Sequence, residues 1–353
     1  WTINNGKLYF NTVLYTGNAS ASRAITGVGF QPDWVWVKSR SATYYHGLWD
    51  AVRTNKSALY SNVTNAEDTT TGGTLGSLDS DGFTTPNVSG GGFININSVT
   101  YASWNWKAGT SVSGDTTGSG TLKTYTGSVN TTSGFSIIKY TGNGTAGHTI
   151  PHHLGAAPSM VIVKKLSASG TDWFCYHKSL GNTHYIPLNT TAVASDNVVT
   201  WNDTTPTSTV FTLGISGTTN SNNADIIAYC FAEKKGYSKF GSYTGNGSTD
   251  GTFVYTGFKP AFVMIKATGL VKNWLTFDNR RLGYNGAGTN KQLHPNTNGT
   301  ESSGNGTTLD ILSNGFKTRT TDSDENGSGQ NYIYMAFAEN PFTTSTGVPT
   351  TAR

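Results

Sequence analysis

The sequence predicts an all-β protein made of three tandem antiparallel β-sandwich repeats of about 90–100 residues each. Only 12% of its residues are charged, about half of the usual share, and 43 of 353 are glycine, which indicates many neutral turns. The 9 Trp, 17 Tyr and 16 Phe exclude a disordered chain, and the scarcity of Ala, Glu, Lys and Leu excludes a helix bundle. The third observation is a set of motifs that recurs three times.

Each copy opens with Tyr-Thr-Gly-Asn and continues into an apolar segment that starts with proline and ends with lysine. The opening motifs start at Tyr15, Tyr140 and Tyr243. The apolar segments are Pro32–Lys38, Pro158–Lys164 and Pro260–Lys266. The closing strands end at Trp106, Phe231 and Phe337. From the opening Tyr to the closing residue the intervals are 91, 91 and 94 residues, which favours one repeated unit over chance matches.

The strand before each opening motif is expected to be half-exposed, as in 135–140 and 238–243. The Asn-Gly that follows favours a tight turn, because both residues tolerate positive φ. The segment Met160–Val163 is apolar on both faces and therefore predicts a central strand that is covered on both sides. The prolines precede the strand interiors, where a missing N–H does little harm.

The repeats predict a division of the chain into three β-sandwich domains, 1–109, 135–236 and 237–342. Residues 110–134 are rich in Gly, Ser and Thr and are expected to form a flexible linker. Residues 343–353 are left as a C-terminal tail. The second and third repeats are expected to abut, and the first to be tethered.

Charge and hydropathy exclude two classes of partner. The net charge of +4 is spread without runs, which is too weak for a nucleic-acid binding track. No apolar stretch approaches the roughly 20 residues of a membrane span, and no signal peptide is visible after Trp1. We therefore expect neither nucleic acid nor a membrane as a partner.

Asp50 with Arg53, echoed by Asp278 with Arg281, is the strongest catalytic candidate. A carboxylate three residues from a guanidinium could bind a polar ligand or tune an acid, but a local ion pair that closes a turn is favoured. His177 takes the aspartate position in the middle copy, so no shared reaction can depend on the pair. The recurring lysines at the segment ends are expected to cover the sheet edge with their stems.

Two sequence clusters raise the question of a metal. His148, His152 and His153 lie within six residues but have no Cys or carboxylate nearby, so turn residues are favoured over a zinc site. Residues 322–327 resemble the opening of a calcium loop, yet Ile333 stands where the loop needs glutamate, which favours a polar hairpin loop. We predict no catalytic, cofactor-binding or metal-ligating residues and no cofactor. Cys175 and Cys230 could be bridged or could pack as buried thiols.

Four tryptophans are the candidate contact residues. Trp34, Trp36, Trp104 and Trp106 alternate with other residues on two expected strands. We expect one member of each pair to face the core and its neighbour to face outward, where an exposed aromatic ring can stack on a sugar or anchor a protein partner. The alternative is that both sheet faces are buried, so that none of the four is available for contact.

Several motifs together resemble a repeat family of virion proteins from tailed phages, common in marine and cyanobacterial viruses. They are Tyr-Thr-Gly-Asn-Gly, the Gly-Phe-x-Pro of residues 29–32 and 257–260, the Ser-Asp-Gly-Phe of residues 80–83, and the segment 332–342. The resemblance covers about residues 8–342. It implies a phage structural protein of the tail-fibre or head-appendage kind, located in the virion, and it transfers no catalytic residues.

The expected function is therefore a bacteriophage virion structural protein that is not an enzyme, most simply a tail fibre or other appendage that adheres to the host surface. Its expected partners are other virion proteins, a glycan or protein of the host cell surface, and further copies of the chain. Two alternatives stay open: a capsid decoration or head-fibre protein, and a polysaccharide-degrading tailspike enzyme. The enzyme would need two convergent carboxylates, and only 20 acidic residues are available.

Overall fold

The computed structural model describes residues 3, 5–53, 56–167, 169–281, 285, 291–302 and 308–340. The fold is all-β, as predicted, with 42% strand, 2% helix and antiparallel pairing between the strands. In the described ranges, helical structure occurs as a 3₁₀ turn at Gly6–Leu8 and as α1 at Val198–Trp201. Among the described residues, no helix has the length and apolarity that a membrane span needs. The tail 343–353 lies outside the described residues.

The strands form three groups, each with one large sheet and one three-stranded small sheet. The first large sheet has the order β1-β8-β3-β4-β5, and its small sheet has the order β2-β7-β6. The large sheet contains β1 (Phe10–Thr16), β8 (Thr100–Trp106), β3 (Trp34–Ser39), β4 (Gly47–Asp50) and β5 (Leu59–Tyr60). The small sheet contains β2 (Ala24–Thr26), β7 (Gly82–Thr84) and β6 (Ser77–Asp79).

The second large sheet has eight strands in the order β17-β16-β15-β14-β19-β12-β11-β9, and its small sheet has the order β10-β13-β18. The large sheet contains β17 (Ser195–Asp196), β16 (His184–Pro187), β15 (Phe174–His177), β14 (Met160–Lys165), β19 (Asp225–Phe231), β12 (Phe135–Thr141), β11 (Thr124–Asn130) and β9 (Thr110–Asp115). The small sheet contains β10 (Thr117–Gly118), β13 (His148–Pro151) and β18 (Val210–Leu213).

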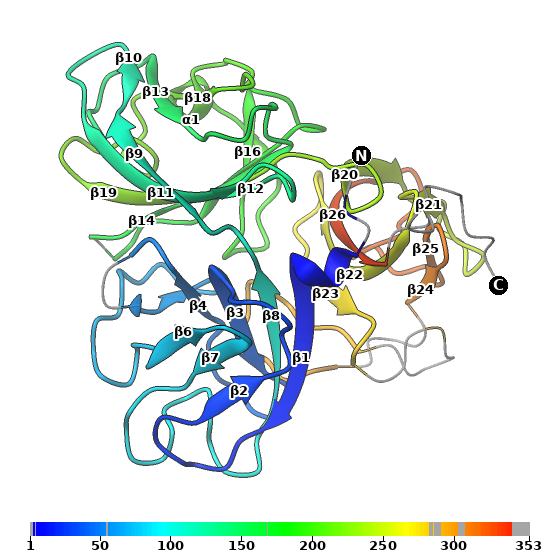
Figure 1. Cartoon of the computed structure of the whole chain (residues 1–353). Coiled ribbons are helices and arrows are strands. Elements are labelled where there is room, and N and C mark those ends of the chain that lie inside the picture. The colour runs from blue at the N-terminus through cyan, green and yellow to red at the C-terminus, as the bar shows by residue number, and fades with distance from the viewer. Residues whose placement is uncertain are drawn as a thin grey trace.

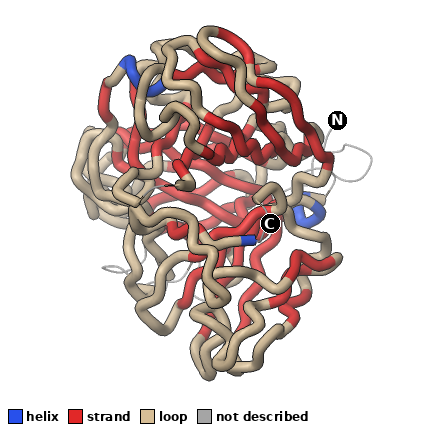
Figure 2. The backbone as a smooth tube through the Cα atoms, turned by 90° about the vertical axis from the view of Figure 1, so that its left-hand side faces the viewer, coloured by secondary structure: helices blue, strands red, loops and turns tan. Residues whose placement is uncertain are grey.

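The third large sheet has the order β20-β26-β22-β23, and its small sheet has the order β21-β25-β24. The large sheet contains β20 (Ser238–Thr244), β26 (Asn331–Asn340), β22 (Lys259–Ala267) and β23 (Leu275–Asp278). The small sheet contains β21 (Phe253–Tyr255), β25 (Gly315–Thr318) and β24 (Leu309–Leu312). Figure 1 shows the three groups, coloured blue, green and yellow to red, around a common centre. Loops and turns make up much of the outer ends of the molecule (Figure 2).

The hydrophobic core has four parts. Three clusters lie in the separate groups, where the apolar side chains of each large sheet meet those of its small sheet. The fourth, which we name the central core, combines residues from all three large sheets. Strand β14 shows the division: Met160 and Ile162 belong to the central core, whereas Val161 and Val163 belong to the core of the second group. The prediction of a central strand covered on both sides is confirmed for this segment.

The Tyr-Thr-Gly-Asn motif joins each large sheet to the loop before its closing strand. A side chain on Gly17 would come within 1.9 Å of the carbonyl oxygen of Ile96, so the close backbone approach requires glycine. The backbone N–H of the next residue, Asn18, donates a hydrogen bond to Oδ1 of Asn95, which is buried. The same contact recurs between Asn143 and Asn220 and between Asn246 and Asn326.

Residues 110–134 are not a flexible linker, and that prediction is wrong. Strand β11 pairs along its length with β12, and β9 pairs with β11, so that this stretch extends the second large sheet. Tyr125 and Val129 are buried in the core of the second group. Strand β9 is an edge strand and its residues are mostly exposed, which explains why its composition resembles that of a linker.

Candidate functional site

The Asp50–Arg53 pair is a buried ion pair. Oδ2 of Asp50 lies 2.7 Å from Nε of Arg53, and Oδ1 accepts the backbone N–H groups of Val52 and Arg53. The interpretation as a local pair that closes a turn is confirmed. The pair does more than this, because Oδ2 also accepts a 2.8 Å hydrogen bond from the hydroxyl of Tyr229 in the second large sheet.

Asp278 and Arg281 have the same geometry in the third group, with 2.6 Å between Oδ2 and Nε. Here the donor from the neighbouring sheet is Trp104, whose Nε1 lies 3.0 Å from Oδ2 of Asp278. In the second group His177 accepts the N–H of Ser179 at Nδ1 and donates from Nε2 to the carbonyl oxygen of Tyr334. These contacts join the first sheet to the second, the second to the third and the third to the first.

Two further sets of contacts close the same circle. In the first set a ring N–H donates to a backbone carbonyl of another group: His46 to His294, Trp173 to Tyr60 and Trp274 to Pro187, over 2.8–3.0 Å. In the second set a backbone N–H donates to a backbone carbonyl: Glu67 to Leu166, Ala194 to Thr268 and Glu301 to Arg40. We name these nine contacts the junction bonds. Through these contacts, the polar residues that stood out in the sequence, Asp50, His177 and Asp278, connect the three groups of strands.

The four tryptophans proposed as contact residues are all buried in the central core. Trp34, Trp36, Trp104 and Trp106 have exposed fractions of 0–2%. The expectation of outward-facing members is wrong because residues two positions apart on a strand share one face. The ring centroid of Trp34 lies 4.4 Å from that of Tyr229, in the second large sheet. The alternative, in which both sheet faces are buried, describes these strands correctly.

The recurring lysines are also buried, which corrects the expectation that their stems cover a sheet edge. Lys38, Lys164 and Lys266 lie on β3, β14 and β22, and each of these strands has a neighbour on both sides. Each Nζ donates to backbone carbonyls, such as Thr171 for Lys164 and Ala267 for Lys266. Burial lowers the pKa of all three ammonium groups to about 8.

The histidine cluster is not brought together as a metal site. His148 hydrogen-bonds Asn220 and Thr116, and His152 hydrogen-bonds the carbonyl of Thr207. His153 instead contacts the hydroxyl of Tyr125 at 2.8 Å. In the part of the chain that the structure describes, no three His, Cys, Asp or Glu residues form a group that could hold a metal ion.

The calcium-like loop lies between β25 and β26, and its acidic residues have separate partners. Oδ1 of Asp322 accepts the backbone N–H of Asp324, and the carboxylate of Asp324 pairs with Lys272 at 2.7 Å. Glu325 is buried beneath them, and burial raises its pKa well above the ordinary value, with Asp322 and Asp324 adding to the effect. The arrangement is that of a folded polar loop.

The two cysteines are free thiols. Cys175 belongs to the central core, whereas Cys230 belongs to the core of the second group. The two side chains therefore lie on opposite faces of one sheet, which excludes a bridge in this fold. Burial raises the pKa of both thiols.

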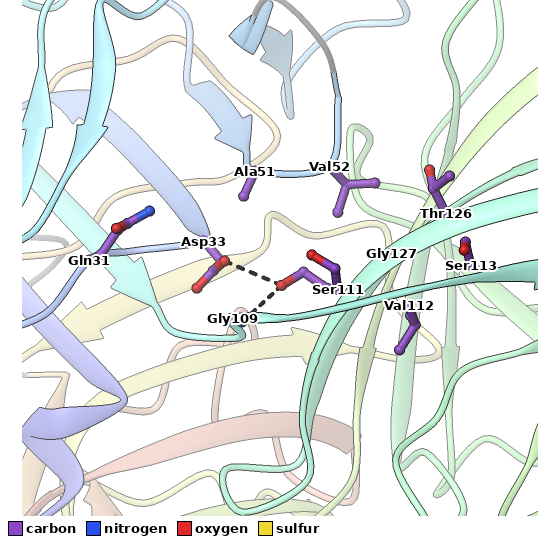
Figure 3. Close-up of a pocket in the computed structure, with 11 residues that line it drawn as sticks. Gln31, Asp33, Ala51, Val52, Gly109, Ser111, Val112, Ser113, Thr126 and Gly127 are labelled. Atoms are coloured by element: carbon purple, nitrogen blue, oxygen red, sulfur yellow. Dashed lines mark hydrogen bonds between the residues drawn. The ribbon is translucent and has the colours of Figure 1, made fainter.

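An open cavity of about 510 Å³ lies between the first and second groups (Figure 3). Its wall consists of Gln31, Asp33, Ala51, Val52, Gly109, Ser111, Val112, Ser113, Thr126, Gly127 and Ser128. Oδ2 of Asp33 accepts the N–H of Ala108 at 2.9 Å, and Oδ1 accepts the hydroxyl of Ser128 at 3.3 Å. Burial raises the pKa of Asp33, although both hydrogen bonds oppose the rise.

The chemistry of this cavity is that of a hydroxyl-lined pocket with one partly buried acid. Ser111, Ser113 and Thr126 can exchange hydrogen bonds with a polar ligand, and Asp33 is the one titratable group among the lining residues. Glycoside hydrolysis needs a pair of carboxylates, whereas the nearby Asp50 is already bonded to Arg53 and Tyr229. Sequence reasoning missed Asp33. The available signal was an acid at a position where the other repeats have Ser159 and Ala261.

Comparison with known proteins identifies the family of the chain. Neither the curated proteins nor the solved structures include a significant match to it. A family model described as a domain of unknown function, DUF7483, matches residues 5–341, which is most of the sequence. The chain therefore belongs to the DUF7483 family.

Proposed function

We propose that this protein is a structural component of a bacteriophage particle, a tail fibre or similar appendage that adheres to the host surface. The observation that carries the proposal is that the junction bonds form a closed circle. In this circle the buried charged and polar residues hold the three large sheets together. A rigid body of this kind suits a protein that bears load and presents loops. The biological setting of the proposal rests on the resemblance of its motifs to those of virion proteins from tailed phages.

We further propose that the three groups are copies of one β-sandwich unit arranged around an approximate threefold axis. The order of opening, closing, proline-initiated and following strand is the same in the three large sheets. The junction bonds relate equivalent positions in cyclic order, as Asp50, His177 and Asp278 do. A single chain would then supply the threefold packing that a fibre otherwise obtains from three subunits.

The test is to locate the protein on the particle. Antibody against the purified chain, visualised on intact virions by immunogold electron microscopy, should label the tail or its appendages. Label spread over the head lattice would instead support a capsid decoration protein and overturn the appendage assignment. Absence of label, together with absence of the chain from purified virions by mass spectrometry, would overturn the structural role itself.

A further inference from the structure

Two aromatic side chains are exposed side by side on the outer face of the third small sheet. Phe253 and Tyr255 are 44% and 64% exposed, and Val254 between them is buried in the core of the third group. Strand β21, which carries them, is the edge strand of this sheet (Figure 1). Because residues two apart on a strand share a face, both rings lie on the side that faces solvent.

Two glycines beside these rings leave them accessible. Tyr255 pairs across the strands with Gly315, and Phe253 pairs with Lys317. A side chain on Gly315 would come within 3.1 Å of Cε2 of Phe253, and one on Gly257 would come within 3.5 Å of the Tyr255 hydroxyl. The rings therefore rest over glycine backbone, and no neighbouring side chain at these two positions covers them.

A row of charged groups borders the aromatic pair. Asp250, whose side chain is 80% exposed, pairs with Lys317 at 2.6 Å and with Arg319 at 3.3 Å. Arg319 also pairs with Asp310, which lies opposite Lys317 on β24. The two acids balance the two bases, so the row offers fixed donors and acceptors without a net charge.

The fold does not require this arrangement. The first small sheet has Ala24 and Thr26 on β2 with the same exposed-buried-exposed pattern, and Gly82 lies opposite Thr26 as Gly315 lies opposite Tyr255. The corresponding strand of the second group, β13, carries Thr149 and Pro151 at its partly exposed positions. Aromatic residues at these positions are specific to the third group.

We propose that this face, which we name the aromatic platform (Phe253, Tyr255, Asp250 and Lys317), binds a neutral glycan chain. The C–H faces of sugar rings pack on Phe253 and Tyr255, and their hydroxyl groups exchange hydrogen bonds with Asp250 and Lys317. The balanced charge argues against single-stranded nucleic acid, because stacking platforms for nucleic acid need a positive groove for the phosphates. The inference deepens the proposed adhesive function and rests on it, since it names the surface and the class of receptor.

The experiment uses the full chain on an array of neutral oligosaccharides built from glucose, galactose, mannose and N-acetylglucosamine. The best binder is then titrated by calorimetry against Tyr255→Ala, Phe253→Ala and Tyr255→Phe. We expect about a tenfold or greater loss of affinity for each alanine variant and near-normal affinity for Tyr255→Phe, because the phenyl ring retains the stacking surface. Thr26→Ala, at the equivalent exposed position of the first group, is the matched control and should bind normally.

Three outcomes would overturn the platform: no binding of the wild-type chain to any neutral glycan, binding that both alanine variants retain, or tighter binding to single-stranded DNA than to glycan. Thermal unfolding of each variant ensures that lost binding is not lost folding. The result is also separable from the particle-labelling experiment. A chain that binds glycan but labels the head overturns only the appendage assignment, whereas a tail-located chain that binds none overturns only the platform.

Discussion

The hydroxyl of Tyr229 donates a 2.8 Å hydrogen bond to Oδ2 of Asp50, which lies 179 residues earlier and in a different sheet. Both side chains are fully buried, and the same carboxylate oxygen also pairs with Arg53. This one oxygen therefore connects a local turn to the contact between the first and second groups. Removing one hydrogen-bond donor from a buried carboxylate lowers the free energy of unfolding, because the carboxylate is then incompletely bonded. The contact between Tyr229 and Asp50 can therefore be tested by removing one of its two side chains at a time.

Tyr229→Phe removes the hydroxyl and keeps the ring that packs on Trp34. We expect the free energy of unfolding to fall by about 1.5–3 kcal/mol, because a hydrogen bond to a charged group is lost in a buried site. Urea unfolding followed by fluorescence measures the change. Tyr255→Phe, at an exposed tyrosine, should stay within about 0.5 kcal/mol of wild type. Equal effects from the two substitutions would contradict the junction role.

Asp50→Ala should be more severe than loss of the hydroxyl. Burial alone would lower the pKa of Arg53, but Asp50, Tyr229 and Glu67 together raise it above the ordinary value, so the guanidinium stays charged. Removing the carboxylate leaves that charge buried beside Glu67 alone, at a cost of about 3–5 kcal/mol. The control is Asp225→Ala, which breaks the partly exposed pair with Lys139 and should cost less than about 1 kcal/mol in the same urea series.

Acid should destabilise the protein through its buried histidines. Burial lowers the pKa of His152 and His177 to about 4, whereas the unfolded chain titrates near 6.5. The unfolded state therefore binds more protons between these values, so stability is lost as the pH falls from about 6.5 toward 4. Each histidine contributes a loss of at most roughly 1.4 kcal/mol for every pH unit in this range. Unfolding curves recorded between pH 7 and 4.5 measure the slope of the free energy of unfolding against pH. This range lies above the pH at which most carboxylates titrate.

His177→Gln tests the assignment of this slope. Glutamine can still donate to the carbonyl of Tyr334 but has no proton to gain in this range. We expect the stability of the variant to fall less steeply with acid than that of the wild type. An unchanged slope would show that His177 does not contribute to the loss.

The sequence predicted the all-β fold, because strands and turns follow from local patterns. Tyr-Thr-Gly-Asn recurs because its Gly allows a close backbone approach and its Asn bonds a buried Asn some 77 residues later, as Asn18 does with Asn95. The Asp50–Arg53 pair was also visible, since three residues separate its members. Its bond to Tyr229 was not visible, because that contact depends on how two distant sheets meet.

The errors about the tryptophans and the lysines share one physical origin, the central core. Where both faces of a sheet are covered, a strand such as β3 is buried along its whole length, and its pattern does not tell which face is solvated. Trp34 then resembles a surface contact residue in the sequence and Lys38 a residue that covers a sheet edge, although both are buried. Conversely, the edge strand β9 is so exposed that its composition resembles that of a linker.

Trp34→Ala separates a core role from a contact role. The indole lies in the central core against Trp106 and Tyr229, so its removal should lower the free energy of unfolding by about 3–5 kcal/mol. Tyr255→Ala removes an aromatic ring of the platform and should leave stability within about 1 kcal/mol of wild type. Thermal unfolding monitored by near-ultraviolet circular dichroism compares the two, and a stable Trp34→Ala variant would restore this residue as a contact candidate.

Alkaline pH should stabilise the protein through its three buried lysines. Their pKa is lowered to about 8 by burial, whereas the unfolded chain titrates near 10.4. Between these values the unfolded state binds more protons at these three lysines than the folded state, so the lysines should raise the free energy of unfolding as the pH increases from about 8 to 9. Above about 9 the trend should reverse, because the buried thiols of Cys175 and Cys230 and buried tyrosines such as Tyr140 have a raised pKa and stay protonated while those of the unfolded chain ionise. Lys164→Met keeps an unbranched side chain without the titrating group and should make the rise shallower, because one of the three lysines no longer contributes. Lys139→Met, at a partly exposed lysine, should leave the slope unchanged. A Lys164→Met variant whose stability rises as steeply as that of the wild type would mean that the Lys164 ammonium group titrates normally in spite of its burial.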